Sequence, residues 1–332
     1  MKALVTGGGG FLGRAIVRLL LEDGVEVCSF SRRAHADLDA LGVEHRQGDL
    51  ADGHAVAAAL AGCDIVYHVA ARAGVWGPYR EFYRANVQGT RNVIQACRAH
   101  GIRRLVHTSS PSVVFDGSDM EGVDETVPYP ARYHAFYPQT KAEAEQLVLQ
   151  ANDSDLATVA LRPHLIWGPE DNHLVPRILD RGRRGELRRI GNRECLVDTI
   201  YIDNAAQAHL QAAEHLEVGS PVAGKVYFLS QGEPLPLWDV VDRILEAGGI
   251  APVSGTISPG VAYGAGWVLE KIYGLLKLRS EPRMTRFLAR ELSTAHWFDI
   301  GAARRDFGYA PQVSFDEGMA RLRAWLSVRA AG

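Results

Sequence analysis

The sequence predicts an α/β protein: a Rossmann-type, doubly wound parallel sheet with a smaller, mostly helical C-terminal substrate domain. A glycine-rich turn at residues 7–13 directly follows a short apolar run. Short apolar runs then alternate with helical patterns until about Pro163, where the rhythm breaks. Such alternation is typical of right-handed crossovers that place helices on both faces of a parallel sheet.

The elements follow from this rhythm. The expected strands lie at residues 2–6, 25–30, 43–50, 63–71, 103–110, 156–163 and 224–230. The expected helices lie at residues 11–24, 51–62, 79–100 and 135–150, and the segment 199–216 is expected to be a strand edge leading into a helix. From about residue 231 helices are expected to dominate. The predicted domains are a dinucleotide-binding domain, residues 1–164 and 198–230, and a substrate-binding domain, residues 165–197 and 231–332.

Composition limits the possible functions. The chain has 332 residues, of which 47% are hydrophobic, and a net charge of −3, so a large core is expected and a nucleic-acid partner is not. The four cysteines show no CxxC spacing, which argues against a metal site and for a reducing compartment. The sequence shows neither a secretory signal nor a run of about twenty apolar residues. A cytoplasmic protein is therefore expected.

The turn after the first strand predicts a dinucleotide site. Gly7, Gly10 and Gly13 would allow a tight turn, close approach of a pyrophosphate, and packing of helix on strand. The following helix would direct its free N–H groups and positive end at the phosphates. A plain loop is the alternative, but the place between a strand and an amphipathic helix favours binding. Phe11 and Leu12 complete this predicted site.

The end of the second strand bears on the choice of cofactor. NAD usually requires an acidic residue there for the ribose 2′-hydroxyl, whereas this chain has Ser31, Arg32 and Arg33. A hydroxyl followed by two guanidinium groups suits a 2′-phosphate, so NADP(H) is favoured over NAD. The alternative is that the arginines only begin a solvated helix.

Two further strand ends complete the predicted cofactor site. Asp49 and Leu50 follow the third strand, where the carboxylate could hold the adenine amino group or instead cap the next helix. Val69, Ala70 and Ala71 end the fourth strand with little bulk, as a wall against a cofactor requires.

Tyr137 and Lys141 predict the chemistry. They stand one helical turn apart in a chain with only five lysines, so both should project from one helix face. A neighbouring ammonium should lower the pKa of the phenol, which makes it a usable proton donor. Tyr273 and Lys277 share the spacing but follow no strand or hydroxyl cluster. The first pair therefore predicts hydride chemistry on a carbonyl or alcohol.

A hydroxyl cluster ends the fifth strand at Thr108, Ser109 and Ser110. One of these groups could donate a hydrogen bond to a substrate oxygen as charge develops on it, with Ser110 favoured. Serines at strand ends are also ordinary turn formers, so this role depends on the Tyr137 helix.

Two segments leave alternatives open. The arginine-rich region 177–193 is interpreted as a solvated face; alternatively, one of its arginines receives a substrate carboxylate together with His164 or His173. The apolar residues of 266–280 suit a buried core helix, the wall of a substrate tunnel, or a helix that lies on a membrane or partner.

Taken in order, the motifs TGGGGFLG, GDL, HVAA, NVQGT, TSS, YPQTK and LRPHLIWGP resemble those of the extended short-chain dehydrogenase/reductases. The pattern is most similar to the 3β-hydroxysteroid dehydrogenase branch, and the C-terminal run 285–322 resembles bacterial reductases of 2-alkyl-3-oxoalkanoic acids in long-chain olefin biosynthesis.

The resemblance implies roles for single residues. Tyr137 would protonate the carbonyl oxygen, Lys141 would hold the nicotinamide ribose, and Ser110 would bind the substrate oxygen. Asn86 would support the proton relay, or the helix that positions it. Pro163 and Ile166 would flank the nicotinamide.

The expected function is thus NADPH-dependent reduction of a 2-alkyl-3-oxoalkanoic acid to the 3-hydroxy acid. The alternatives are a 3β-hydroxysteroid dehydrogenase, including one that decarboxylates a sterol carboxylate, a sugar-nucleotide epimerase, and a non-catalytic NADP-binding sensor. The resemblance further implies a hydrophobic substrate and a homodimer, and it leaves room for peripheral association with a membrane or other pathway enzymes.

Overall fold

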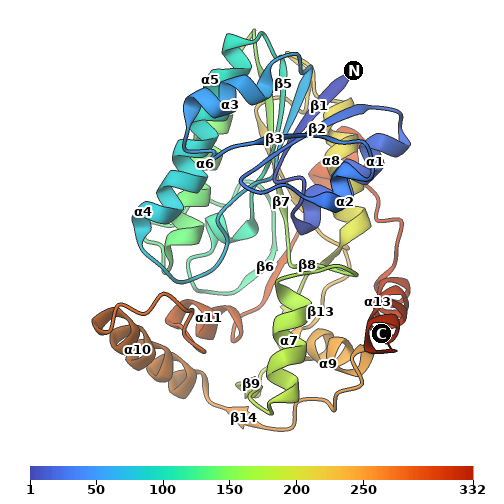
Figure 1. The fold of residues 1–332 in the computed structure, drawn as a ribbon. Helices are drawn as coiled ribbons and strands as arrows, with labels where there is room; N and C mark the ends of the chain where they lie inside the picture. The colour runs from blue at the N-terminus through green and yellow to red at the C-terminus, as the bar shows by residue number, and fades with distance from the viewer. Residues whose placement is uncertain (332) are drawn as a thin grey trace.

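The computed structural model describes residues 1–331 and contains a seven-stranded, fully parallel sheet (Figure 1). Its strands are β1 (Lys2–Thr6), β2 (Glu26–Ser31), β3 (Glu44–Gln47), β4 (Ile65–His68), β5 (Arg104–Thr108), β7 (Ala157–Pro163) and β12 (Lys225–Leu229). They lie in the order β12-β7-β5-β4-β1-β2-β3. The order reverses between β1 and β4, which is where open α/β sheets bind ligands at their carboxyl edge. The predicted fold class is confirmed.

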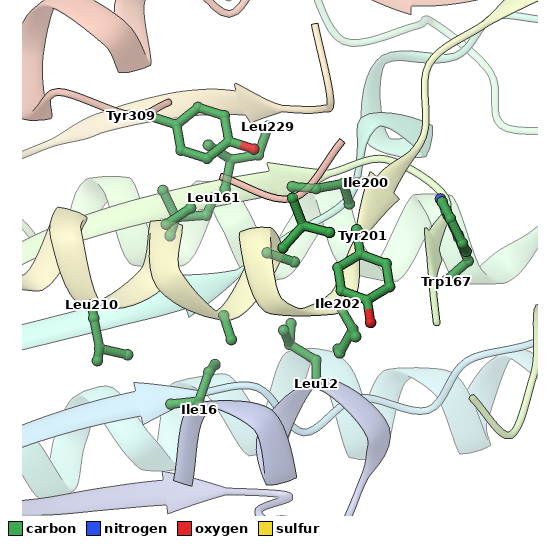
Figure 2. Packing of buried hydrophobic residues seen from close by; sticks show 14 of the residues in the cluster. Leu12, Ile16, Leu161, Trp167, Ile200, Tyr201, Ile202, Leu210, Leu229 and Tyr309 are labelled. Atoms are coloured by element: carbon green, nitrogen blue, oxygen red, sulfur yellow. The ribbon is translucent and has the colours of Figure 1, made fainter. Parts of the chain in front are cut away.

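Helices cover both faces of this sheet because strand residues alternate in direction. Ala3 and Val5 of β1 point to the face covered by α1 (Phe11–Glu22) and α8 (Ile202–Glu214). Figure 2 shows Leu12 and Ile16 of α1 directed toward Ile202 and Leu210 of α8. This contact joins α1, which begins at the glycine turn, to α8, which lies some 190 residues later in the chain. It holds the glycine turn in place at the carboxyl edge of the sheet.

The opposite face is covered by helices from the first half of the chain. Leu4 of β1 packs there with residues of α3 (Gly53–Leu60), α5 (Gly89–Ala99) and α6 (Phe136–Gln150). The helix expected at 79–100 is a continuous helical run of three parts: α4 (Tyr79–Phe82), a π-helical turn at Tyr83–Gln88, and α5. A π turn within a helix often marks a functional position, and here it contains Asn86.

Below the carboxyl edge lies a second part of the structure (Figure 1). Its helices are α7 (Leu174–Arg183), α9 (Leu237–Ala247), α10 (Pro259–Leu275), α11 (Arg286–Glu291) and α13 (Phe315–Ala331), whereas α12 (Gly301–Phe307) packs on β12 of the main sheet. Its short strands are β6 (Met120–Val123), β8 (Ile166–Trp167), β9 (Arg189–Ile190), β10 (Leu196–Val197), β11 (Ile200–Tyr201), β13 (Leu235–Pro236), β14 (Thr256–Ile257) and β15 (His296–Phe298).

Four of these strands form a mixed sheet in the order β13-β10-β15-β6. The sequence did not predict it, because strands of two to four residues show no alternation of apolar and polar residues. β6 comes from the loop after β5, so this sheet attaches the C-terminal region to the edge where the predicted catalytic residues lie. The domain boundaries given above remain a prediction.

Candidate active site

The predicted glycine turn is built around the backbone of Gly7. This residue has φ +70°, and a Cβ there would lie 3.0 Å from Cα and Cβ of Ala70. A Cβ on Gly13 would lie 2.2 Å from the carbonyl oxygen of Gly7. Gly10 is the N-cap of α1 and donates its N–H to the same oxygen at 2.8 Å. A side chain at Gly13 would therefore push α1 away from the turn, and one at Gly7 would collide with the segment that follows β4.

The first turn of α1 fits a phosphate group. No side chain caps this end of the helix, so its free N–H groups remain available to an anion. The helix has twelve residues and its buried face, which includes Leu12, holds it against the core. Phe11 is half-buried at the helix start. These features match what a dinucleotide pyrophosphate requires.

The ring of His35 rests on the glycine turn, which sequence reasoning missed. A Cβ on Gly9 would lie 2.2 Å from Nε2 of this imidazole. His35 stands in the loop that follows Ser31, Arg32 and Arg33 and precedes α2 (Ala36–Asp39). It has no local sequence signal, because only the folded loop brings it back over residue 9.

The residues predicted to recognise a 2′-phosphate lie together at the end of β2. The hydroxyl of Ser31 donates to the carbonyl oxygen of Arg33 at 2.7 Å and lies 3.0 Å from Nε2 of His45. Arg32 and Arg33 are exposed, and neither side chain forms an ion pair within residues 1–331. Two unpaired guanidinium groups beside the glycine turn are consistent with an anionic ligand.

Asp49 and Leu50 follow β3 as predicted. Asp49 accepts the N–H of Ala51 at 3.0 Å, but the N-cap of α3 is Asp52, so the helix-cap alternative for Asp49 is wrong. The Asp49 carboxylate is exposed and lies 3.8 Å from Arg84. Leu50 is half-buried against Gly89 of α5.

Val69, Ala70 and Ala71 line the exit from β4. Ala70 donates its N–H to the hydroxyl of Thr6 at 3.1 Å, which ties this strand end to that of β1. Val69 and Ala70 are half-buried and Ala71 is exposed, so small side chains border the edge on this side. Across it, Pro163 ends β7 fully buried and Ile166 begins β8 half-buried.

Tyr137 and Ser110 face each other across the predicted catalytic site. Tyr137 is in the first turn of α6, and Ser110 caps the short 3₁₀ helix Pro111–Val114 after β5. Burial raises the pKa of Tyr137, while hydrogen bonding by Ser110 lowers it in part. The two hydroxyl groups can therefore contact one substrate oxygen between them.

Lys141 is buried beneath this pair. Its ammonium donates to the carbonyl oxygen of Thr108 at 2.5 Å and lies 3.3 Å from Nε2 of His107. Burial lowers the pKa of Lys141 to about 8, and burial together with the Lys141 charge holds the pKa of His107 well below its usual value. The prediction that Lys141 lowers the pKa of Tyr137 is wrong for this arrangement, because burial raises that pKa and Lys141 contacts β5 instead.

Asn86 joins the loop after β4 to the catalytic helix. Its side-chain oxygen accepts the N–H of Arg72 at 2.7 Å, and its Nδ2 donates to the Thr140 hydroxyl at 3.0 Å. Thr140 precedes Lys141 in α6, so the side chain of Asn86 helps to fix that turn of the helix. This geometry suits a supporting role rather than direct contact with Tyr137.

The C-terminal region adds a carboxyl group that sequence reasoning missed. Glu291 ends α11 and lines a small cavity with Ser112, His164 and His296. Burial raises the pKa of Glu291 to about 8. When ionised, the carboxylate of Glu291 in turn raises the pKa of Tyr137. No motif marks Glu291, which is about 150 residues from Tyr137 in the chain.

The arginine-rich region is mainly a surface feature, as interpreted from the sequence. Arg184 and Arg193 pair with acidic residues at the surface, and His173 is exposed at the start of α7. Arg177 pairs with Glu281. The positive charge of Arg177 also offsets a part of the rise that burial causes in the pKa of Glu291. His164, in contrast, lies in the cavity beside Glu291.

The apolar segment 266–280 is neither core nor a transmembrane span. In α10 only Ala262 and Gly266 are buried, and a Cβ on Gly266 would lie 2.6 Å from the backbone of Thr285. The outer face is apolar and exposed, at Val261, Trp267, Val268, Ile272, Leu275, Leu276 and Leu278. Within the described chain, no helix has the length and apolar character needed to cross a membrane.

Comparisons with known proteins identify the family of this chain. Residues 4–257 match the 3-beta hydroxysteroid dehydrogenase/isomerase family. The chain is 54% identical to the 2-alkyl-3-oxoalkanoate reductase of Stenotrophomonas maltophilia (98% of this chain, 99% of that protein). It is 50% identical to the protein of the same name from Shewanella oneidensis (98% and 86%) and 35% identical to a decarboxylating sterol-4-alpha-carboxylate 3-dehydrogenase of Mus musculus (96% and 89%).

Solved structures share the fold. The crystal structure of gox2253 superimposes with a TM-score of 0.79 at 28% identity, covering 99% of this chain and 98% of that one. The UDP-glucose 4-epimerase of Thermus thermophilus, solved with NAD, gives a TM-score of 0.75 at 25% identity and covers 98% and 99%. The expected resemblance is confirmed: the chain is an oxidoreductase that belongs to the 3-beta hydroxysteroid dehydrogenase/isomerase family.

Proposed function

We propose that this protein reduces a 2-alkyl-3-oxoalkanoic acid to the corresponding 3-hydroxy acid with NADPH. The observation that carries the proposal is the pairing of Tyr137 with Ser110 at the carboxyl edge of the sheet, beside a glycine turn that fits a dinucleotide. The two relatives named 2-alkyl-3-oxoalkanoate reductase, at 54% and 50% identity, support this substrate class.

Each residue of the proposed active site has a separate role in the reaction. Ser110 and Tyr137 hold the keto oxygen, and Tyr137 donates its proton as negative charge develops there. A raised pKa keeps the phenol protonated until that charge appears. Lys141 supplies a buried positive charge below the site, and Asn86 holds the turn of α6 that carries it.

NADPH, when bound, supplies the hydride. Gly7, Gly10 and Gly13 would hold its pyrophosphate, while Ser31, Arg32 and Arg33 would receive its 2′-phosphate. The absence of an acidic residue at the end of β2 supports NADPH over NADH. Asp49, Leu50, Val69, Ala70, Ala71, Pro163 and Ile166 complete the proposed cofactor site.

The test replaces one hydroxyl. Tyr137→Phe should lower kcat for NADPH oxidation with a 2-alkyl-3-oxoalkanoic acid by about 10²–10⁴-fold, because the proton donor is removed. Tyr273→Phe is the matched control: it shares the spacing to a lysine but packs against Trp76, and should change kcat less than twofold. Equal turnover by Tyr137→Phe and the wild-type enzyme would refute the proposed acid.

A 3β-hydroxysteroid dehydrogenase is the second candidate, favoured by the 35% identity to a sterol carboxylate dehydrogenase. The two activities share chemistry, so a substrate panel separates them. A kcat/KM for 3-oxosteroids above that for 2-alkyl-3-oxoalkanoic acids would favour this second candidate.

We also propose that the exposed face of α10 lies on an anionic lipid surface. Of the eleven large apolar side chains that are exposed in the described residues, seven lie between Val261 and Leu278. Three basic side chains are exposed beside them: Lys271, Lys277 and Arg279. The nearby carboxylate of Glu270 forms an ion pair with Arg286. An apolar face with a tryptophan and a basic border is typical of helices that bind the membrane interface.

Vesicles test this surface. Sedimentation with phosphatidylglycerol vesicles should retain the wild-type protein and lose the triple variant Trp267→Ser, Leu275→Ser, Leu276→Ser, with much weaker binding to phosphatidylcholine. Val328→Ser, an exposed apolar residue elsewhere, serves as the control. Equal sedimentation of both variants would contradict the proposal, as would a triple variant that changes only the oligomeric state.

Three expectations stay predictions. The homodimer rests on family resemblance, and light scattering would measure it. The cytoplasm is the proposed compartment, supported by four free, buried cysteines. The division into a cofactor part and a substrate part is proposed at the boundaries stated above.

A further inference from the structure

Next to Ser110, the structure forms a small cavity that the proposed chemistry does not use. Ser112, two residues beyond Ser110, lines it from the catalytic side, and its hydroxyl lies 2.9 Å from that of Ser110. His164, Glu291 and His296 line the other sides. Polar groups from three distant parts of the chain therefore meet beside the predicted position of the keto oxygen.

Glu291 is the acidic group of this cavity. No hydrogen bond from residues 1–331 reaches its carboxyl, although burial raises its pKa to about 8. Its charge raises the pKa of Tyr137, so the carboxyl lies close enough to the phenol to interact with it. Burial therefore favours the protonated carboxyl, whose O–H group has no acceptor among the described residues.

The two histidines are neutral and hold Glu291 in place. Nε2 of His296 lies 2.9 Å from the backbone oxygen of Glu291, which can only accept, so this nitrogen carries the proton. Nδ1 of His296 then accepts from Nε2 of His164 at 2.7 Å. Burial lowers the pKa of both imidazoles. The pair fixes the end of α11 and adds no charge to the cavity.

We propose that the carboxyl group of Glu291 binds the carboxylate of the oxo acid and thereby makes the enzyme select acids over simple ketones. This inference rests on the proposed function. In such a substrate the carboxyl carbon is separated from the keto carbon by one carbon atom, so its subsite must adjoin Ser110 and Tyr137. An O–H group that donates to a carboxylate forms a strong, charge-assisted hydrogen bond.

The subsite should respond to pH. The titratable and charged groups that face Glu291 are Tyr137 on α6, His164 after β7, His296 on β15 and Arg177 on α7. The histidines stay neutral, and Arg177 is partly neutralised by Glu281. As the pH rises through about 8, Glu291 loses its proton and repels the substrate carboxylate, so KM for the acid should rise.

The experiment compares a 2-alkyl-3-oxoalkanoic acid with the dialkyl ketone that lacks its carboxyl group. Glu291→Ala should lower the ratio of kcat/KM for acid over ketone by about 10–100-fold, the effect of one hydrogen bond to a charged group. Glu291→Gln keeps a neutral donor, so it should restore most of this ratio and remove the rise of KM above pH 8. Glu246→Ala, an exposed acid on α9, is the control and should keep the wild-type ratio.

The results with these variants can contradict the carboxylate subsite in two ways. Equal losses for acid and ketone in Glu291→Ala would overturn the subsite and place Glu291 among residues that act on Tyr137 or on the fold. A Glu291→Gln variant as poor as Glu291→Ala would also overturn it. Failure of the proposed function is seen separately, because the wild-type enzyme would then reduce neither the acid nor the ketone.

Discussion

Lys141 donates a hydrogen bond from its buried ammonium to the backbone oxygen of Thr108, at a distance of 2.5 Å. This bond joins the catalytic helix α6 to the end of β5, where Ser110 follows two residues later. The lysine therefore positions the helix of the proton donor relative to the hydroxyl that faces it. The interaction holds a charge in a site that disfavours charge.

The burial of Lys141 should appear in the pH dependence of stability. Its pKa is about 8 in the folded protein and about 10.4 in an unfolded chain, so the folded state binds fewer protons between these values. The contribution of Lys141 to the free energy of unfolding should thus rise by about 3 kcal/mol as the pH increases from about 8 to about 10.4. Lys141→Met removes this rise.

Guanidinium unfolding at several pH values measures this contribution of Lys141, as the difference in the free energy of unfolding between the wild-type protein and Lys141→Met. A difference that stays constant from about pH 7 to about pH 10.5 would show that the lysine titrates normally.

The glycine turn should not tolerate a methyl group at residue 13. The Cβ of Gly13→Ala would lie 2.2 Å from the oxygen of Gly7, so α1 must shift. We expect a loss of about 1–3 kcal/mol in the free energy of unfolding, together with weaker NADPH binding. Gly264→Ala, where a Cβ meets open space inside α10, should leave NADPH binding unchanged and raise the free energy of unfolding by up to about 1 kcal/mol. Thermal unfolding and fluorescence titration with NADPH check the pair of variants.

A second contact of α6 with the sheet is a buried ion pair to β7. Arg162 of β7 donates to Glu145 at 2.6 Å and 2.9 Å, and Glu145 also accepts from Tyr129 at 2.6 Å. Arg162→Leu should lower the free energy of unfolding by about 3–5 kcal/mol, because it leaves a buried carboxylate unpaired. The double variant with Glu145→Leu should recover part of the loss in urea unfolding. No recovery would mean that the packing of Arg162 against Phe228 outweighs its charge.

The choice of cofactor should depend on the two arginines after β2. Arg32→Ala combined with Arg33→Ala should raise KM for NADPH at least tenfold, by removing about 1.5–3 kcal/mol of charge-assisted hydrogen bonding, and leave KM for NADH nearly unchanged. Arg323→Ala, an exposed arginine on α13, is the control. Steady-state kinetics with both cofactors give the answer. Equal changes for NADPH and NADH would mean that these side chains do not contact the 2′-phosphate.

The sequence by itself determined the features that depend on neighbouring residues. The spacing of Gly7, Gly10 and Gly13 defined the turn, and the four-residue interval from Tyr137 to Lys141 placed both side chains on α6. Most strands of the main sheet follow from apolar runs between turns, although β3 consists of polar residues. These signals are local, because strand and helix periods repeat within ten residues.

The tertiary structure alone decided which distant groups meet. Glu291 and His296 reach the cavity beside Ser110 through α11 and β15, and neither belongs to a periodic pattern. The partner of Lys141 is a backbone oxygen on another strand, so the sequence could place the ammonium on its helix but not assign its contact. The four-stranded sheet joins short segments that are stable only as neighbours. Such contacts depend on burial and on the path of the whole chain, which no local spacing records.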